Sequence, residues 1–356
     1  MKKTIRTSLL IAFLTTLVIQ TNAQDALYSQ FNYAPTYLNP GMAGTGKNNL
    51  RLSALSKVQW FNLYKPYKYL FGGLDYSIYD DFNRNVLNLG LNLNHSEKGY
   101  LGNTNITGIV GRSFGTNKMD CSSWFLSIAL QAGYNFAKVN PNEFVFSDQL
   151  DQTGITGTPS TVDLFKTYNT KNYFDFSSGF VFTFKDFMIG GSVHHMNEPN
   201  TSFNGKPEDG KLPKKITGHF SYRLETDLIT LKPTVITQFQ GKSSVFTAGA
   251  LIDYYEFPIE MGLWYRNAVG MANNNAICIG LTWKWGEATT VTSRKKEYSS
   301  KIGLNYDADI SRPGIIATHG SMEFGLQKDI ITNKDKTCPT SLTGQCDDYL
   351  FPWEFL

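Results

Sequence analysis

Apolar and polar residues alternate with a period of two along most of this chain. Residues 86–94 read Val-Leu-Asn-Leu-Gly-Leu-Asn-Leu-Asn, with leucine at every odd position from 87 to 93. Residues 124–136, 174–184 and 277–285 repeat the pattern with aromatic and aliphatic side chains. Successive side chains of a β-strand point to opposite faces. Each stretch therefore predicts a strand with one apolar face and one polar face.

The polar faces consist mainly of Asn, Gly, Ser, Thr and Gln, and the apolar faces end in aromatic residues. A strand in a soluble sandwich would carry charged residues on its outward face. An apolar outer band with aromatic ends, together with a polar interior, is typical of a transmembrane β-barrel. The pattern thus favours a membrane barrel over a soluble sheet.

Alternation between turn signals predicts about fourteen strands. The predicted strands are residues 48–57, 69–80, 85–95, 105–114, 123–138, 173–184, 186–195, 215–224, 230–240, 245–254, 258–265, 275–285, 301–307 and 321–328. Single-chain bacterial barrels usually have an even number of strands. We therefore predict an all-β fold, with residues 48–328 forming one antiparallel transmembrane β-barrel.

The connections between predicted strands are short on one side and long on the other. The short side comprises 81–84, 185–186, 225–229 and 255–257, and the long side 139–172, 196–214, 266–274 and 308–320. Outer-membrane barrels have short periplasmic turns and longer outer loops. We expect the long connections to face outward. Residues 286–300 are an exception, a long polar link on the expected periplasmic side.

Composition agrees with a membrane barrel. Charged residues make up 18% of the chain, below the share of about 25% that is usual in soluble proteins. After the N-terminal region, no stretch approaches the roughly 20 apolar residues of a membrane-spanning helix. The net charge of +3 is too small to indicate a nucleic-acid partner, and we expect none.

The first 23 residues predict a signal peptide. Lys2 and Arg6 precede an apolar run at residues 9–19, and residues 21–23 form a small-residue cleavage site. The mature chain is then expected to begin at Gln24. The alternative, a membrane anchor, is disfavoured because the apolar run is short for a span.

Export permits disulfides, and Cys338 and Cys346 lie close together in a polar C-terminal tail, residues 329–356. They are candidates for closing a small loop by a disulfide. The alternative, a metal site, has poor support because no histidine lies nearby. We expect the tail to lie in the periplasm, where its apolar end at residues 349–356 would form a docking surface.

Motifs for catalysis are absent from the sequence. There is no Gly-x-Ser-x-Gly elbow, His-Glu-x-x-His helix or phosphate-binding loop. The pair His194-His195 is adjacent in sequence, and neighbouring residues on a strand face opposite sides. We expect both histidines near the outer rim rather than in one site. We expect no enzyme activity, no catalytic residue, no cofactor and no metal.

Residues 24–60 carry an ordered set of elements. A Gln-Asp start precedes a Ser-Gln-aromatic triplet, an Asn-Pro-x-x-Ala-Gly run, an Arg and a Gln-Trp pair. Together these resemble the PorP/SprF family of type IX secretion and gliding-motility membrane proteins. The motif falls on Gln30, Asn39, Pro40, Ala43, Gly44, Arg51, Gln59 and Trp60. Gly41 departs from the pattern, because the family usually has Ala there.

The resemblance implies an outer-membrane barrel of Bacteroidetes-type bacteria, similar in form to fatty-acid transporters. It also implies a role in the secretion or surface anchoring of an adhesin through that adhesin's C-terminal domain. Periplasmic components of the secretion machine are the further partners that it implies. Two alternatives stay open: a transporter for hydrophobic small molecules and an outer-membrane hydrolase.

Residues 24–47 are expected either to plug the barrel or to form a loose periplasmic leader. Irregular backbone cannot face lipid, because its polar groups would lack partners. The segment contains Tyr28, Phe31, Tyr33 and Tyr37. Disordered leaders are poor in aromatic residues, so we favour the plug.

The outer loops 139–172 and 196–214 are the longest, and we expect them to bind the partner. The first contains Phe144, Phe146, Leu164, Phe165 and Tyr168. Such apolar side chains suit the core of an interface. The alternative interpretation is a lid that merely closes the barrel.

Overall fold

The computed structural model describes part of the 356-residue chain. The described residues are 25–46, 49–80, 85–115, 124–140, 144–151, 154–157, 169–203, 210–269, 275–290, 296–311 and 314–330. The predicted signal peptide and residues 331–356 lie outside them, as do Leu164, Phe165, Tyr168, Cys338 and Cys346. None of the helices in the described residues is long and apolar enough to cross a membrane.

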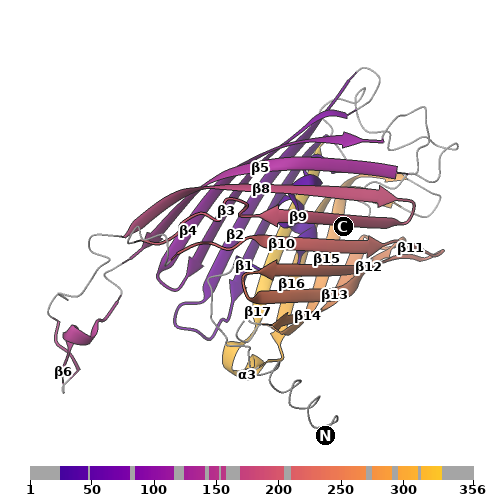
Figure 1. Ribbon diagram of the computed structural model, residues 1–356. Coiled ribbons are helices and arrows are strands. Elements are labelled where there is room, and N and C mark those ends of the chain that lie inside the picture. The colour runs from indigo at the N-terminus through magenta and orange to yellow at the C-terminus, as the bar shows by residue number, and fades with distance from the viewer. Residues whose placement is uncertain are drawn as a thin grey trace, which may run out of the picture.

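Fourteen strands of the described chain close into one antiparallel barrel (Figure 1). Their bounds are β1 (Leu50–Gln59), β2 (Tyr67–Tyr79), β3 (Asn85–Lys98), β4 (Leu101–Phe114), β5 (Trp124–Val139), β8 (Thr170–Phe184), β9 (Phe187–His194), β10 (Lys215–Tyr222), β12 (Ile229–Gln240), β13 (Ser243–Tyr254), β14 (Ile259–Val269), β15 (Ala276–Thr290), β16 (Lys296–Asp309) and β17 (Ser321–Ile330). Each strand pairs with its neighbours along the chain, and pairing of β1 with β17 closes the ring. The predicted fold class is confirmed.

The observed strands match the predicted ones in number and order, but several are longer. β16 begins at Lys296 instead of 301, and β4 begins at Leu101 instead of 105. β17 continues to Ile330, so its last two residues were wrongly included in the predicted tail. Alternation weakens toward the strand ends, where side chains leave the apolar band, and the sequence pattern therefore marks the ends poorly.

The alternating pattern separates the outer and inner faces of the barrel. On β3, Leu91 is 54% exposed whereas its neighbour Asn92 is 1% exposed. The same holds on β15, where Trp283 is exposed and Thr282 is buried. The apolar face therefore points outward, as it does in a barrel surrounded by lipid.

The antiparallel order places the connections at two ends of the barrel. We call the end with connections 60–66, 140–169, 195–214 and 310–320 the loop end. The opposite end, with connections 80–84, 185–186, 223–228 and 255–258, is the turn end. The short elements η4 (Ser147–Gln149), β6 (Leu150–Asp151), β7 (Gly154–Ile155) and α3 (Ile315–Thr318) belong to the loop end, and β11 (Leu224–Glu225) to the turn end.

Residues 25–46, which we call the N-terminal plug, lie inside the barrel (Figure 1, indigo). The plug contains three short helices, η1 (Phe31–Tyr33), α2 (Pro35–Leu38) and η2 (Pro40–Met42). It begins at the loop end, where Asp25 contacts Lys215 at the start of β10. It ends at the turn end, where the Gly44 N–H donates to Asp75 near the end of β2. The chain thus passes along the whole lumen before the first strand begins.

Candidate functional site

The candidate site is the N-terminal plug together with the inward side chains that hold it. Three attachments follow one another along the lumen: a central network, a turn-end clamp and a loop-end cluster. Each joins plug backbone or side chains to charged residues on strands that are distant in sequence.

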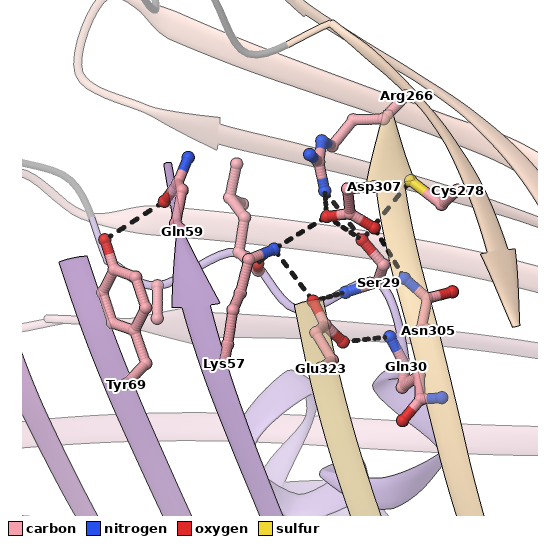
Figure 2. Close-up of polar contacts among 12 residues, drawn as sticks. Ser29, Gln30, Lys57, Gln59, Tyr69, Arg266, Cys278, Asn305, Asp307 and Glu323 are labelled. Atoms are coloured by element: carbon pink, nitrogen blue, oxygen red, sulfur yellow. Dashed lines mark hydrogen bonds and ion pairs between the residues drawn. The ribbon is translucent and has the colours of Figure 1, made fainter. Parts of the chain in front are cut away.

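The central network begins with Glu323 on β17 (Figure 2). Its carboxylate accepts hydrogen bonds from the backbone N–H groups of Ser29 and Gln30, each at 2.8 Å. Lys57 on β1 contacts the same carboxylate at 2.8 Å and donates to the Leu27 carbonyl at 2.7 Å. One carboxylate and one ammonium group therefore fix three residues of the plug, Leu27, Ser29 and Gln30.

Asp307 on β16 extends this network (Figure 2). Its carboxylate accepts from the Ser29 hydroxyl at 2.8 Å and from Lys57 at 2.9 Å. Arg266 on β14 donates to Asp307 at 3.1 Å and to the Ser29 hydroxyl at 2.8 Å. The four charged groups, two cations and two anions including Glu323, are at most 3% exposed. Buried charges are tolerated only when paired, so each charge depends on the others.

Tyr33 packs deeper in the plug against two glycines of the barrel wall. Gly303 and Gly325 face each other on β16 and β17, and a Cβ added to Gly325 would lie 2.5 Å from the Tyr33 ring. The Tyr33 hydroxyl donates to Thr282 at 3.0 Å. The missing side chains therefore create the space that this ring fills.

Arg51 and Asp75 form the turn-end clamp. Arg51 on β1 binds the Asp75 carboxylate through two nitrogens, at 2.8 and 3.1 Å. The same guanidinium donates to the Met42 carbonyl at 2.7 Å, and Asp75 accepts from the Gly44 N–H at 2.8 Å. Gly44 has φ of +70° and no space for a Cβ beside Asn88. The motif arginine and glycine thus hold the end of the plug.

Asn39 ties the plug to the opposite wall. Its Oδ1 accepts from the Gly41 N–H at 2.8 Å and caps η2, whose first residue is Pro40. Its Nδ2 donates to the Phe180 carbonyl on β8 at 2.8 Å and lies 2.9 Å from Nε2 of His219 on β10. A Cβ on Gly41 would lie 2.8 Å from Phe180 Cα, so the plug backbone lies directly against β8.

The remaining motif residues divide between the plug and the rim. Ala43 is fully buried in the plug. Gln59 and Trp60 instead lie where β1 ends at the loop end. The Trp60 backbone N–H donates to the Gly320 carbonyl at 2.8 Å, and the Tyr69 hydroxyl donates to the Gln59 side chain at 3.5 Å. The Gln-Trp pair therefore fixes the rim rather than the plug.

At the loop-end cluster, His195 lies between two carboxylates. Its Nδ1 is 2.8 Å from Asp175 on β8, and its Nε2 is 3.0 Å from Asp25 of the plug. Lys215 contacts Asp25 at 2.9 Å. Burial alone would lower the pKa of His195, but the two carboxylates raise that pKa to about 9. Burial would raise the pKa of Asp25, but Lys215 and His195 hold it well below its usual value.

The prediction that His194 and His195 face opposite sides is wrong. His194 faces inward by the regular alternation of β9. His195 has φ of +57°, which breaks this alternation just after β9 and turns the second ring inward as well. The His194 Nε2 lies 3.3 Å from the Leu38 carbonyl and 3.3 Å from the Ser192 hydroxyl. Ser192 itself donates to Leu38 at 2.9 Å. The Ser192 hydroxyl and the His194 ring therefore both hold the plug.

The predicted partner-binding residues are only partly described. The rings of Phe144 and Tyr100 are in edge-to-face contact with centroids 5.1 Å apart, and the Phe146 ring lies 6.2 Å from that of Phe144. Both are half-buried, Phe144 against the connection between β3 and β4. More exposed apolar side chains lie elsewhere at the loop end, above all Tyr64 and Ile316, which are 92% and 88% exposed. Sequence reasoning missed these two residues, although both are apolar residues inside predicted loops.

Sequence reasoning also missed the charged residues of the lumen. Lys57, Asp75, Arg266, Asp307 and Glu323 all lie on the inward faces of strands and are buried. The sequence does contain a signal for these residues: each is a charged residue on a polar strand face that otherwise consists of amides, hydroxyls and glycine. Among the described residues, no group of three His, Cys, Asp or Glu side chains is placed to hold a metal ion.

A closed antiparallel barrel with an apolar outer face and a polar, filled interior defines an outer-membrane β-barrel protein. The family profile of the type IX secretion system membrane protein PorP/SprF matches residues 20–327. The chain belongs to this family and is an outer-membrane component of type IX secretion.

Several solved structures resemble this chain over most of its length at low sequence identity. The toluene transporter TbuX of Ralstonia pickettii has a TM-score of 0.48 and 9% identity, covering 83% of this chain and 93% of that one. The toluene transporter TodX of P. putida gives the same values. Omp33 of Acinetobacter baumannii has a TM-score of 0.40 and 9% identity, with coverage of 79% and 96%. No curated protein matches the chain.

Proposed function

We propose that this barrel supports the secretion or surface anchoring of an adhesin by binding the adhesin's C-terminal domain at the loop end. In this proposal the loop end faces outward, since outer-membrane barrels have long outer loops and short periplasmic turns. The turn end, beyond which residues 331–356 follow β17, faces the periplasmic components of the secretion machine. The observation that carries the proposal is the exposed apolar surface of the loop end.

That surface consists of apolar side chains on several loops. Tyr64 follows β1, Ile316 lies in α3, and Val145 and Ile155 lie between β5 and β8, all at least 50% exposed. None of them lies on the barrel strands, so lipid contact does not account for them. Exposed apolar groups that gather on one end of a protein indicate a surface for a partner.

Part of the surface is already ordered. The Asn62 N–H donates to the Thr318 carbonyl at 3.3 Å, and the Asn62 side chain donates to the Ala317 carbonyl at 3.1 Å. The loop after β1 and helix α3 therefore form one ledge that presents Tyr64 and Ile316. A preformed surface loses less conformational entropy on binding.

The filled lumen supports an anchoring role over a conducting one. Tyr33, Asn39 and Met42 have no exposed surface at all. A polypeptide could pass only if the plug left, and that would break the buried ion pairs of the central network. A transporter for hydrophobic small molecules would need an apolar path. Most buried inward side chains are instead charged or hydrogen-bonding. The apolar wall residues among them, such as Met188 and Trp264, pack against Phe31, Leu38 and Met42 of the plug and leave no open apolar path there.

The test changes the ledge in cells that display the partner. We expect the double variant Tyr64→Asp/Ile316→Asp to fold and reach the outer membrane, but to release the adhesin into the medium. Leu228→Asp is the matched control, because Leu228 is 58% exposed at the turn end. Immunolabelling of intact cells and blotting of the medium measure retention. Full retention of the adhesin by the double variant would show that this ledge is not the docking surface.

The loop between β5 and β8 provides a second arm of the test. Replacing residues 141–168 by a short Gly-Ser linker leaves both strands intact. We expect a heat-modifiable barrel in the outer membrane and loss of the surface partner. If the partner stays attached and functional, this loop is a lid, and the ledge alone carries binding.

A further inference from the structure

A cavity of about 110 Å³ lies at the loop end, between the plug and the inner faces of β3, β4, β5 and β8. Asp25, Tyr28 and Tyr37 of the plug form one side of it. A single buried water needs roughly a tenth of this volume. The cavity therefore has room for a small solute in contact with both the plug and the barrel wall.

The wall of the cavity is rich in uncharged amides. Six of them come from β3, β4 and β5: Asn92, Asn94, Asn103, Asn105, Gln131 and Asn135. Each amide offers both a donor and an acceptor in one plane. Tyrosine rings also line it, with Tyr28 and Tyr37 in edge-to-face contact at 5.1 Å, beside several charged side chains and histidines. Such a wall suits a solute that carries hydrogen-bonding groups and apolar C–H faces together.

Several polar atoms of this wall are buried without a partner in the structure. They are the acceptors Asn94 Oδ1, Gln131 Oε1 and Asp175 Oδ1, and the donor Asn135 Nδ2. Asn135 and Asp175 are 4% and 6% exposed. Buried polar atoms are rarely left unpaired in proteins. Their arrangement calls for a ligand, or ordered water, that brings mainly donors and at least one acceptor.

Most of the charged groups that line the cavity are paired with one another. Asp25 contacts Lys215 and His195, and Asp175 contacts His195. Lys98, which also lines the cavity, has its ammonium group 5.9 Å from the centre of the Tyr69 ring. Binding an ion would disturb these pairs. The unpaired atoms therefore favour a neutral ligand.

We propose that this cavity binds a neutral sugar, either free or as the end of a glycan chain. Sugar hydroxyls supply the donors and acceptors that the orphaned amide and carboxylate atoms need, and the C–H faces of the ring pack on tyrosine. Because the ligand contacts the plug and the wall at once, its binding stabilises the loop-end attachment of the plug. This site is separate from the ledge of Tyr64 and Ile316.

The experiment uses the full-length protein purified in detergent. Saturation-transfer NMR is recorded with glucose, galactose, N-acetylglucosamine and a purified cell-surface polysaccharide, and with toluene as an apolar comparison. We expect a signal from at least one sugar and none from toluene. Binding of a monosaccharide identifies a free sugar as sufficient, whereas binding of the polysaccharide alone identifies a glycan end.

Matched variants locate the site. Gln131→Met removes an amide from the cavity, and Gln327→Met makes the same change on the inner face of β17 near the turn end. Loss of one or two hydrogen bonds should weaken sugar binding about fivefold to tenfold in the first variant only. Equal binding in both variants would overturn the proposal.

A measurement on the unaltered protein avoids dependence on folding of the variants. Iodination followed by mass spectrometry reports access to Tyr28 and Tyr37, and bound sugar should slow their modification. Tyr64, which is 92% exposed outside the cavity, serves as the internal reference. If no sugar gives a signal or protects these rings, or if only toluene binds, the cavity is not a sugar site.

Discussion

Lys57 and Glu323 are directly opposite each other where the first and last strands pair to close the barrel. Their side chains both point inward, and Nζ lies 2.8 Å from Oε1. The same two groups bind plug backbone on either side, at Leu27 and at Ser29. Closure of the barrel and seating of the plug therefore depend on one ion pair.

We predict that Glu323→Gln loosens the plug. The change leaves Lys57 without one of its two carboxylates and weakens the bonds to Ser29 and Gln30. Removing one partner of a buried pair costs about 3–5 kcal/mol. Hydrogen exchange measured by mass spectrometry should show faster exchange in residues 25–46. Glu97→Gln is the control, because Glu97 forms an exposed pair with Lys68 at 3.6 Å, and such pairs contribute little. Unchanged exchange in Glu323→Gln would contradict the role of the pair.

We predict that Gly325→Ala displaces Tyr33. The new Cβ would overlap the ring, and overpacking of a filled interior costs about 1–3 kcal/mol. Gly72→Ala is the matched control, since nothing lies within 4 Å of the position of its Cβ. Denaturant titrations of the two variants in detergent micelles measure the difference. Equal stability of both variants would show that the wall yields easily at this point.

We predict that the loop-end attachment of the plug weakens in alkali. The pKa of His195 is raised from 6.5 to about 9 by Asp25 and Asp175. A raised pKa stabilises the folded state, here by about 3 kcal/mol. This stabilisation is fully present below about pH 6.5 and is lost as the pH rises through 9. Lys215 and His194 also face this group, but the carboxylates on both ring nitrogens dominate.

Limited proteolysis or hydrogen exchange of residues 25–28 between pH 6.5 and 9.5 measures this effect. His195→Gln should remove most of the pH dependence, whereas His319→Gln, at an exposed position of the same end, should keep it. A pH dependence that persists in His195→Gln would have to arise from another group.

We predict that Leu91→Arg destabilises the barrel by about 2–4 kcal/mol, the cost of a cation on the lipid face near the midplane. Leu91 lies near the middle of β3 and is 54% exposed on the outer face. Tyr64→Arg places the same side chain in water at the loop end and should cost little. Equilibrium unfolding in lipid vesicles compares the two. A small effect at Leu91 would mean that this face does not contact lipid.

The local pattern of the sequence determined the strands. Alternation at residues 86–94 was sufficient to place β3, and Leu91 and Asn92 take the outer and inner faces that it predicted. Strand alternation is a property of adjacent residues and of their solvent, so it can be read without knowing any partner. The resemblance in residues 24–60 likewise indicated the family that the profile match shows.

The tertiary structure alone decided how the lumen is filled. Lys57 and Glu323 are 266 residues apart, and only barrel closure brings them together on the plug. His195 turns inward because of one left-handed backbone angle, which no alternation rule contains. Contacts between distant residues depend on the register and curvature of every intervening strand. For that reason the sequence determined the wall of this protein, and the folded chain determined what the wall encloses.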